Sequence, residues 1–143
     1  MLITGSCHCG NLSYVLDWEP EPVTIPARAC TCSFCTRLAA VWTAHPAARL
    51  RVTVREPAQV SRYAFGTRSA EFHVCARCGV VPVVTSLIAG RLYAVVNVNS
   101  FEAVDPARLS RAAVSFEGED EQTRLTRRQQ HWIADVEIAG AAF

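Results

Sequence analysis

Hydrophobic and polar residues alternate with a period of two along much of this chain, which is typical of half-buried β-strands. In residues 11–18, NLSYVLDW, the apolar side chains of Leu12, Tyr14 and Leu16 occupy every second position. Residues 49–56, RLRVTVRE, follow the same rule, with arginine or threonine between the apolar positions. Each stretch therefore predicts a strand that buries one face and exposes the other.

The middle of the chain continues this pattern. Three further stretches predict strands, namely residues 59–65, 70–75 and 112–119. The sequence GTRS separates the first two and predicts a turn between them. Residues 80–98 predict a β-hairpin that turns at Ala89-Gly90. Pro82 is expected at an edge or a bulge of this hairpin, because proline has no N–H group to donate.

Helical signals are few. Residues 33–40, SFCTRLAA, predict a short helical turn, and Asp105-Pro106 predicts the start of a helix over residues 107–113. The tail, residues 123–135, is ambiguous, so we assign it no element. The pattern as a whole predicts a mainly β fold with short helical pieces.

Composition and charge narrow the function classes. Half of the 143 residues are hydrophobic, which predicts one ordered domain over residues 1–143. The formal net charge of +1 without a basic cluster argues against nucleic-acid binding. No uncharged apolar stretch reaches about 18 residues, and the first ten residues lack the regions of a signal peptide. We therefore expect no membrane span and a cytoplasmic location. All fourteen basic residues are arginine, which excludes a lysine Schiff base.

The seven cysteines form three short groups, CHCG, CTCSFC and CARCG. Two pairs and one triplet divide most simply into a set of four and a set of three. The set of four is Cys7, Cys9, Cys75 and Cys78. The set of three is Cys30, Cys32 and Cys35.

Four thiolates match the tetrahedral ligand set of a structural zinc ion. Glycine follows both pairs and allows a tight turn that directs the sulfurs and nearby N–H groups at one ion. The set of four therefore predicts a zinc ion that joins the N-terminus to the middle of the chain and is needed for folding. A redox-active CxxC pair and a disulfide framework are the alternatives.

Three thiolates on one turn predict a second zinc with an open fourth position, which is the usual arrangement of a catalytic zinc. Such an ion binds an incoming thiol as its thiolate, whereas only about 3% of a free thiol is ionised at pH 7. The alternative is a closed structural site completed by His8, His45 or His73. His45 is also the first candidate for a proton shuttle, and Arg37 is the nearest arginine that could bind a substrate carboxylate.

These motifs resemble the glutathione-dependent formaldehyde-activating enzymes, a family grouped with the centromere protein V domain. The similar segments are GSCHCGNLSYVL, CTCSFCTR, FHVCARCG, VVNVNSFE and RRQQHWI. The resemblance implies an Mss4-like fold of packed, twisted antiparallel sheets. It implies a structural zinc on Cys7, Cys9, Cys75 and Cys78, and a catalytic zinc on Cys30, Cys32 and Cys35.

The resemblance implies the addition of glutathione to formaldehyde, which gives S-hydroxymethylglutathione; the reverse reaction is that of a carbon–sulfur lyase. The chain departs from the family motif C-H-C-S-x-C-R-K, because Thr31 replaces its histidine and Thr36-Arg37 replaces Arg-Lys. The zinc ligands are kept while the wall beside them differs, so the expected partners are a glutathione-like thiol and a small aldehyde whose identities stay open.

Three other functions are consistent with the same residues. The first is a non-catalytic zinc module for protein contacts, and the second is an enzyme with the same chemistry on a different thiol. The third is a thiol-buffering or zinc-handling protein. Assembly into a homo-oligomer is left open by the sequence.

Overall fold

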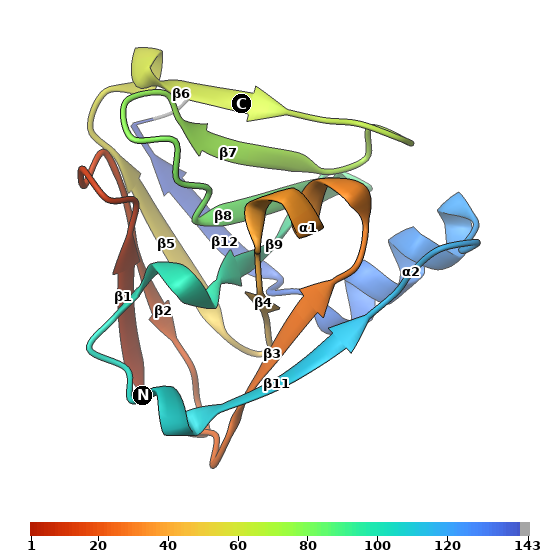
Figure 1. Ribbon diagram of the computed structural model, residues 1–143, viewed down its shortest axis with the longest axis horizontal. Helices are drawn as coiled ribbons and strands as arrows, with labels where there is room; N and C mark the ends of the chain where they lie inside the picture. The colour runs from red at the N-terminus through yellow and green to blue at the C-terminus, as the bar shows by residue number, and fades with distance from the viewer. Residues whose placement is uncertain (141–143) are drawn as a thin grey trace.

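The protein is built around two β-sheets in a computed structural model that describes residues 1–140 (Figure 1). The five-stranded sheet has the order β10-β1-β2-β5-β12, at Phe101–Glu102, Leu2–Ser6, Leu12–Asp17, Arg49–Val54 and Asp135–Ala139. The seven-stranded sheet has the order β11-β3-β4-β9-β8-β7-β6, at Leu109–Val114, Ile25–Cys30, Trp42–Thr43, Arg91–Asn97, Val83–Ile88, Glu71–Cys75 and Val60–Tyr63. The prediction of a mainly β fold is confirmed.

Both sheets are mixed, which refines the expectation of antiparallel sheets. Most neighbouring strands are antiparallel, but β11 pairs with β3 in parallel, and β12 pairs with β5 in parallel. Parallel neighbours need a long connection between them. In both pairs the strands are far apart in the sequence, so a local pattern of alternation does not reveal the pairing.

The period of two places six of the twelve strands of residues 1–140 correctly. The strands β2, β5, β6 and β7 lie within the predicted stretches, and β8 and β9 form the predicted hairpin. Its turn residues Ala89 and Gly90 both have positive φ, 50° and 80°. Pro82 lies just before β8, where its carbonyl accepts a hydrogen bond from the Asn97 N–H at 2.8 Å. The pattern does not predict β1, β3, β4, β10 or β12, and the stretch predicted at residues 112–119 overlaps a strand only at the end of β11, residues 112–114.

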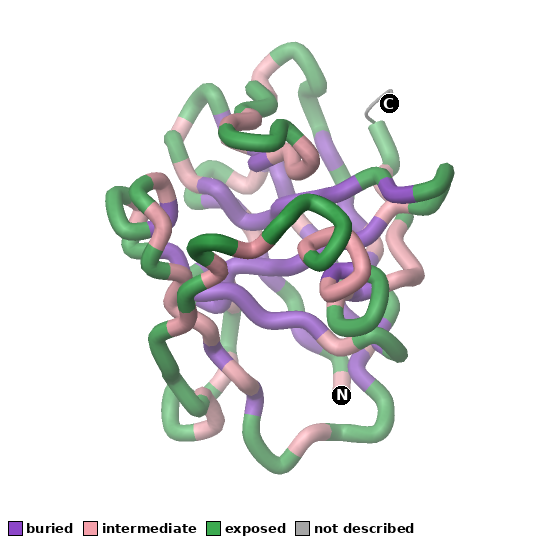
Figure 2. The backbone as a smooth tube through the Cα atoms, turned by 90° about the vertical axis from the view of Figure 1, so that its right-hand side faces the viewer, coloured by how far each residue is buried: buried purple, intermediate pink, exposed green. Residues whose placement is uncertain are grey.

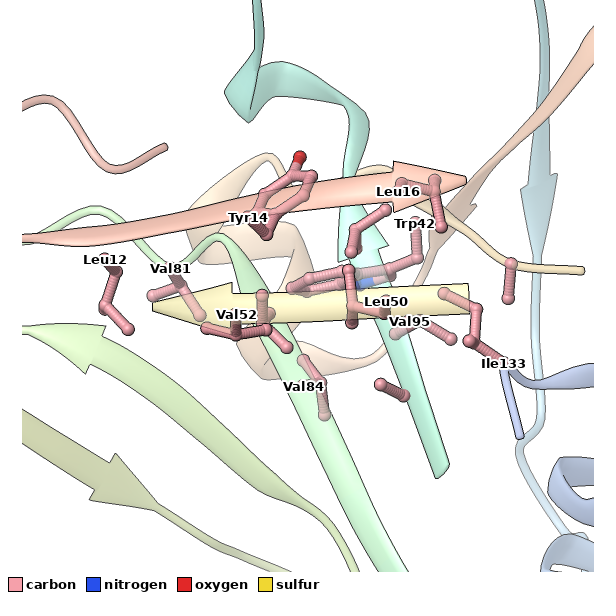
Figure 3. Packing of buried hydrophobic residues seen from close by; sticks show 14 of the residues in the cluster. Leu12, Tyr14, Leu16, Trp42, Leu50, Val52, Val81, Val84, Val95 and Ile133 are labelled. Atoms are coloured by element: carbon pink, nitrogen blue, oxygen red, sulfur yellow. The ribbon is translucent and has the colours of Figure 1, made fainter. Parts of the chain in front are cut away.

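The hydrophobic core lies between the two sheets. Leu16 of β2, Leu50 of β5, Val83 of β8 and Val96 of β9 are almost fully buried in one packed cluster. Side chains from these four strands gather in the same region (Figure 3). Buried segments run through the middle of the molecule, and the exposed residues concentrate in the loops around them (Figure 2). Burial of these apolar side chains supplies the main driving force for packing the sheets together.

The two α-helices of the described residues are short. The first, α1 at Ser33–Leu38, lies where the sequence predicts a helical turn. The second, α2 at Glu121–His131, lies in the tail to which no element is assigned. Within residues 1–140, neither helix is long and apolar enough to cross a membrane. The remaining helical pieces are 3₁₀ turns at Pro57–Gln59, Val98–Ser100 and Pro106–Arg108.

The predicted helix over residues 107–113 is wrong. Asp105 does cap a turn, since its side chain accepts a hydrogen bond from the Ala107 N–H at 2.9 Å. The turn ends after Arg108, and the chain continues as β11 along the edge of the seven-stranded sheet. Pairing with β3 along the whole strand overrides the weak local preference for a helix.

Candidate active site

The set of four cysteines comes together at one point, and we call it the four-cysteine cluster. It consists of Cys7, Cys9, Cys75 and Cys78. Their Sγ atoms lie within 4.8 Å of one another, with 3.8 Å between Cys7 and Cys9 and 3.5 Å between Cys9 and Cys75. Zn–S bonds of about 2.3 Å in a tetrahedron separate the sulfurs by about 3.8 Å. The donor set and its spacing therefore fit a zinc ion.

Tight turns hold this cluster. Cys7 and Cys9 lie between β1 and β2, and Gly10 closes their turn with φ of 82° and an N–H bond to the Cys7 carbonyl. Gly79 does the same after β7, with φ of 80° and a bond to the Cys75 carbonyl. Both glycines adopt the left-handed conformation that other residues rarely take. The predicted tight turns at these two glycines are confirmed, whereas the metal ion stays a prediction.

Burial and backbone hydrogen bonds shift the pKa of two thiols of this cluster, those of Cys7 and Cys78. Burial raises the pKa of the Cys7 thiol to about 11, although the Leu12 N–H donates to its sulfur at 3.3 Å. Burial also raises the pKa of Cys78, but hydrogen bonds with the backbone of Val80 and Cys9 outweigh it and bring the pKa down to about 6. A bound cation would deprotonate the Cys7 thiol.

The set of three cysteines also comes together, and we call it the three-cysteine cluster. It consists of Cys30, Cys32 and Cys35, whose Sγ atoms lie within 4.8 Å of one another. Cys30 ends β3, and Cys32 is the N-cap of α1, where its sulfur accepts a hydrogen bond from the Cys35 N–H at 3.3 Å. The helix start thus fixes the relative positions of the sulfurs.

No fourth ligand joins the three-cysteine cluster within residues 1–140. His8 is exposed beside the other cluster. The His45 ring packs against Trp18 at an interplanar angle of 38°, with 5.6 Å between ring centroids. His73 is buried, and its Nε2 lies 2.7 Å from the Thr85 hydroxyl. The alternative of a closed site completed by one of these histidines therefore finds no support among the described residues.

Neighbouring groups polarise the three thiols. The Trp42 indole N–H donates to the Cys35 sulfur at 3.4 Å. A hydrogen bond with Cys35 is the main cause that lowers the pKa of Cys30 to about 5 against the effect of burial, and the charge of Arg127 contributes to this lowering. The hydrogen bond with Cys30, together with burial, raises the pKa of Cys35. The cluster therefore carries negative charge before any metal is bound.

A cavity of about 770 Å³ opens beside the three-cysteine cluster. Its floor is one face of the seven-stranded sheet. Arg28 and its strand neighbour Trp42 line the cavity, and so do Cys30 and its strand neighbour Val114. Residues at every second position of a strand share a face, so Arg28 and Cys30 both face the cavity. The volume lies in the range of about 300–1,000 Å³ that is typical of small-molecule sites.

The helix α2 contributes a charged wall to this cavity. Arg124, Arg127, Arg128 and His131 all line it. Their spacing of three and four residues puts them on one face of the helix, which we call the arginine face. Most surface helices turn an apolar face inward, whereas α2 turns this polar face toward the cavity.

One carboxylate neutralises part of the arginine face. Glu119, whose side chain is 13% exposed, pairs with Arg124 at 3.3 Å and with Arg127 through two bonds of 3.0 Å. The hydrogen bond from Arg127 is the main cause that keeps the pKa of Glu119 below its usual value. These two arginines therefore already have a negative partner.

Two other arginines of the cavity lack one. Arg128 is 8% exposed and donates to the hydroxyls of Ser69 at 2.9 Å and Ser86 at 3.2 Å, but its Nε has no hydrogen-bond partner. Burial lowers its pKa to about 10. The half-buried Arg28 makes no hydrogen bond or ion pair with any of the described residues. Its pKa is also lowered, mainly by burial.

The structure changes the expected neighbours of the three-cysteine cluster. Arg37 bonds back to the Ser33 carbonyl at 2.9 Å and does not line the cavity. His45 is also absent from the cavity, and among the four histidines only His131 lines it. The sequence pattern misses Arg28 because β3 is not predicted. The spacing of the arginine face was a usable signal in the tail, since three arginines and a histidine recur at helical intervals.

Comparisons with known proteins agree with the cysteine pattern. A family model described as glutathione-dependent formaldehyde-activating enzyme matches residues 2–118. Among solved structures, the chain is similar to a crystal structure of a Rhodobacter sphaeroides protein, with 34% sequence identity and a TM-score of 0.55. That similarity covers 73% of this chain and 92% of the other. A search of curated proteins found no significant match. The family match ends before α2, so the arginine face lies outside it.

Proposed function

The chain belongs to the family of glutathione-dependent formaldehyde-activating enzymes, and from this premise we propose that it is a zinc enzyme of carbon–sulfur bond chemistry. It adds a small thiol, glutathione or a similar one, to a small aldehyde such as formaldehyde, or releases the two from their adduct. The family match supports an enzyme and the thiol and aldehyde classes. The specific substrates and the lyase direction are proposals.

The two clusters take different roles in this proposal. The four-cysteine cluster holds a structural zinc, for which it offers a complete tetrahedral ligand set. The three-cysteine cluster holds a catalytic zinc. The observation that carries the proposal is the absence of a fourth ligand from this cluster within residues 1–140, beside a cavity of ligand size. Zinc bound there supplies a cationic centre that favours the thiolate form of the substrate.

The reaction needs no oxidant or reductant. The thiol sulfur forms a bond to the carbonyl carbon, the π electron pair moves to the carbonyl oxygen, and that oxygen accepts a proton while the thiol proton is released. His131 lines the cavity, and we propose it as the group that carries a proton to or from the oxygen. Trp42 holds Cys35 in place through its indole N–H. Residues 1–143 act as one domain in this proposal, in a reducing compartment that keeps the cysteines free.

The test combines a metal count with a reaction assay. Native mass spectrometry of the wild type should show two zinc ions per chain and a glutathione adduct of the two-zinc form. Exchange NMR with ¹³C-formaldehyde and glutathione should show faster interconversion with the adduct. The Cys32→Ser variant should keep one zinc and lose both the adduct and the acceleration. Two zinc ions with no effect on any thiol and aldehyde exchange would overturn the proposal.

A further inference from the structure

The arginine face is unusual because a helix normally hides its apolar side. On α2, three arginines and His131 face a cavity whose floor includes Val84, Val95 and Phe72. Burying guanidinium groups against apolar side chains costs desolvation free energy unless an anion is bound beside them. The family match ends at residue 118, so this wall belongs to the part of the chain that the match does not cover.

Four arginines line the cavity, whereas its lining holds one carboxylate, the exposed Glu117, which forms no ion pair with them among the described residues. Glu119 satisfies Arg124 and Arg127, which leaves Arg28 and Arg128 without a carboxylate among the described residues. The guanidinium of Arg128 is held between the Ser69 and Ser86 hydroxyls and lies 4.9 Å from the Trp132 ring centroid. These contacts orient the guanidinium plane, while its Nε is left with an unused donor. A buried donor without a partner is rare in folded proteins.

We propose that Arg28 and Arg128 form a carboxylate-binding subsite of this cavity. A guanidinium presents a fork of N–H donors that matches the two oxygens of a carboxylate. Arg28 lies two residues before Cys30 on the same face of β3, so their Cα atoms are about 7 Å apart. A carboxylate held by Arg28 therefore lies within a small molecule's length of the three-cysteine cluster. The ligand class is a small molecule with at least one carboxylate.

The binding of a carboxylate ligand at this subsite is independent of the proposed function. The further claim that this ligand is the substrate rests on the proposed function. Under the proposed function, the subsite selects thiols that carry a carboxylate and discriminates against neutral thiols.

The test uses S-methylglutathione, which keeps both carboxylates of glutathione but has no free thiol to bind a metal. Calorimetry should show binding to the wild-type zinc protein. Affinity should fall about 10- to 100-fold in Arg28→Gln and in Arg128→Gln, because hydrogen bonds between charged groups are lost. Arg37→Gln is the matched control, since Arg37 is exposed and lies outside the cavity; its affinity should equal that of the wild type. The diethyl ester of S-methylglutathione has no free carboxylate. Its affinity for the wild type should be as low as the affinity of S-methylglutathione for the two arginine variants.

The design separates folding and chemistry from recognition. Arg128→Gln could lower the zinc content or the thermal midpoint. In that case the test uses Arg28→Gln and Arg128→Lys, and the lysine keeps the charge but not the fork of N–H donors. Cys32→Ser should bind S-methylglutathione as the wild type does, so the subsite stands even where thiol and aldehyde chemistry fails. Equal affinity for the ester, or unchanged affinity in both arginine variants, would overturn the subsite while leaving the proposed reaction intact. Competition by inorganic phosphate at equal strength would show a general anion site and would overturn the assignment to carboxylates.

Discussion

The two cysteine clusters use the same side chain at similar spacing but tie together different parts of the molecule. The four-cysteine cluster joins the β1–β2 turn of the five-stranded sheet to the end of β7 in the seven-stranded sheet, and Cys9 and Cys75 are 66 residues apart. The three-cysteine cluster spans only residues 30–35, between β3 and α1. A metal at the first cluster closes a long loop and fixes two sheets, whereas a metal at the second fixes one local turn.

Under the proposed function, this difference explains how one fold can hold a structural and a reactive site built from the same side chain. Ligands from distant segments make the metal part of the folding free energy. Ligands from one turn leave the fold nearly independent of the metal, so a coordination position can stay open for substrate. The clusters also differ in surroundings, since the cavity with its arginines lies only beside the three-cysteine cluster.

The largest expected effect follows from breaking the four-cysteine cluster. Cys78→Ser should yield unfolded or insoluble protein, because structural zinc sites contribute about 10–16 kcal/mol, as much as the ~5–15 kcal/mol that stabilises a whole domain. Circular dichroism and sedimentation of the purified variant would check this. A soluble Cys78→Ser protein with wild-type β-sheet signal would show that the two sheets hold together without this metal.

The next effect is large for activity and small for stability. Cys32→Ser should fold, bind one zinc, and lose acceleration of thiol and aldehyde exchange. Its thermal midpoint should fall by only a few degrees, because a weakened helix cap costs about 1 kcal/mol, and serine is itself a good cap. Differential scanning calorimetry with a zinc count measures both quantities. Unfolding like that of Cys78→Ser would remove the distinction between the clusters.

Much of this comparison is predictable from the sequence. The division of the cysteines follows from their spacing, and the β8–β9 hairpin follows from alternation around Ala89-Gly90. What the sequence pattern misses has a physical cause in each case. The strand β3, IPARAC, alternates the buried Ile25 and Ala27 with Pro26 and Arg28. Alanine and proline favour strands weakly, so this short alternation is a faint signal, and the role of Arg28 is missed with it.

The helix α2 is missed for a different reason. Hydrophobic periodicity detects helices whose apolar face is buried, but the inward face of α2 consists of arginines and a histidine. The cavity wall is missed for the same reason, because arginines at helical spacing usually indicate a solvent-exposed helix face. In the region of residues 105–114, a good helix start is overridden by strand pairing that only the folded chain reveals.

A moderate effect is expected from the indole that supports the three-cysteine cluster. Trp42→Phe removes the N–H donor to the Cys35 sulfur and keeps an aromatic ring. Loss of such an outer hydrogen bond typically weakens metal binding about 10- to 100-fold. Competition with a chromophoric chelator should show earlier release of one zinc, with the second zinc held as in the wild type. Equal weakening of both ions would mean that Trp42 acts through the general packing of the core.

The smallest effect tests whether an arginine matters merely by lying next to a cysteine cluster. Arg77 lies between Cys75 and Cys78, yet its side chain is 56% exposed and pairs with the exposed Glu56 at 3.6 Å. Exposed ion pairs contribute about 0–1 kcal/mol, so Arg77→Ala should change the free energy of unfolding by no more than that. Both zinc ions, the exchange activity and the affinity for S-methylglutathione should stay at wild-type values. A loss of zinc from the four-cysteine cluster in this variant would show that its thiolates need a neighbouring cation. Arg77 would then neutralise metal-bound thiolates, whereas Arg28 and Arg128 would bind a ligand carboxylate.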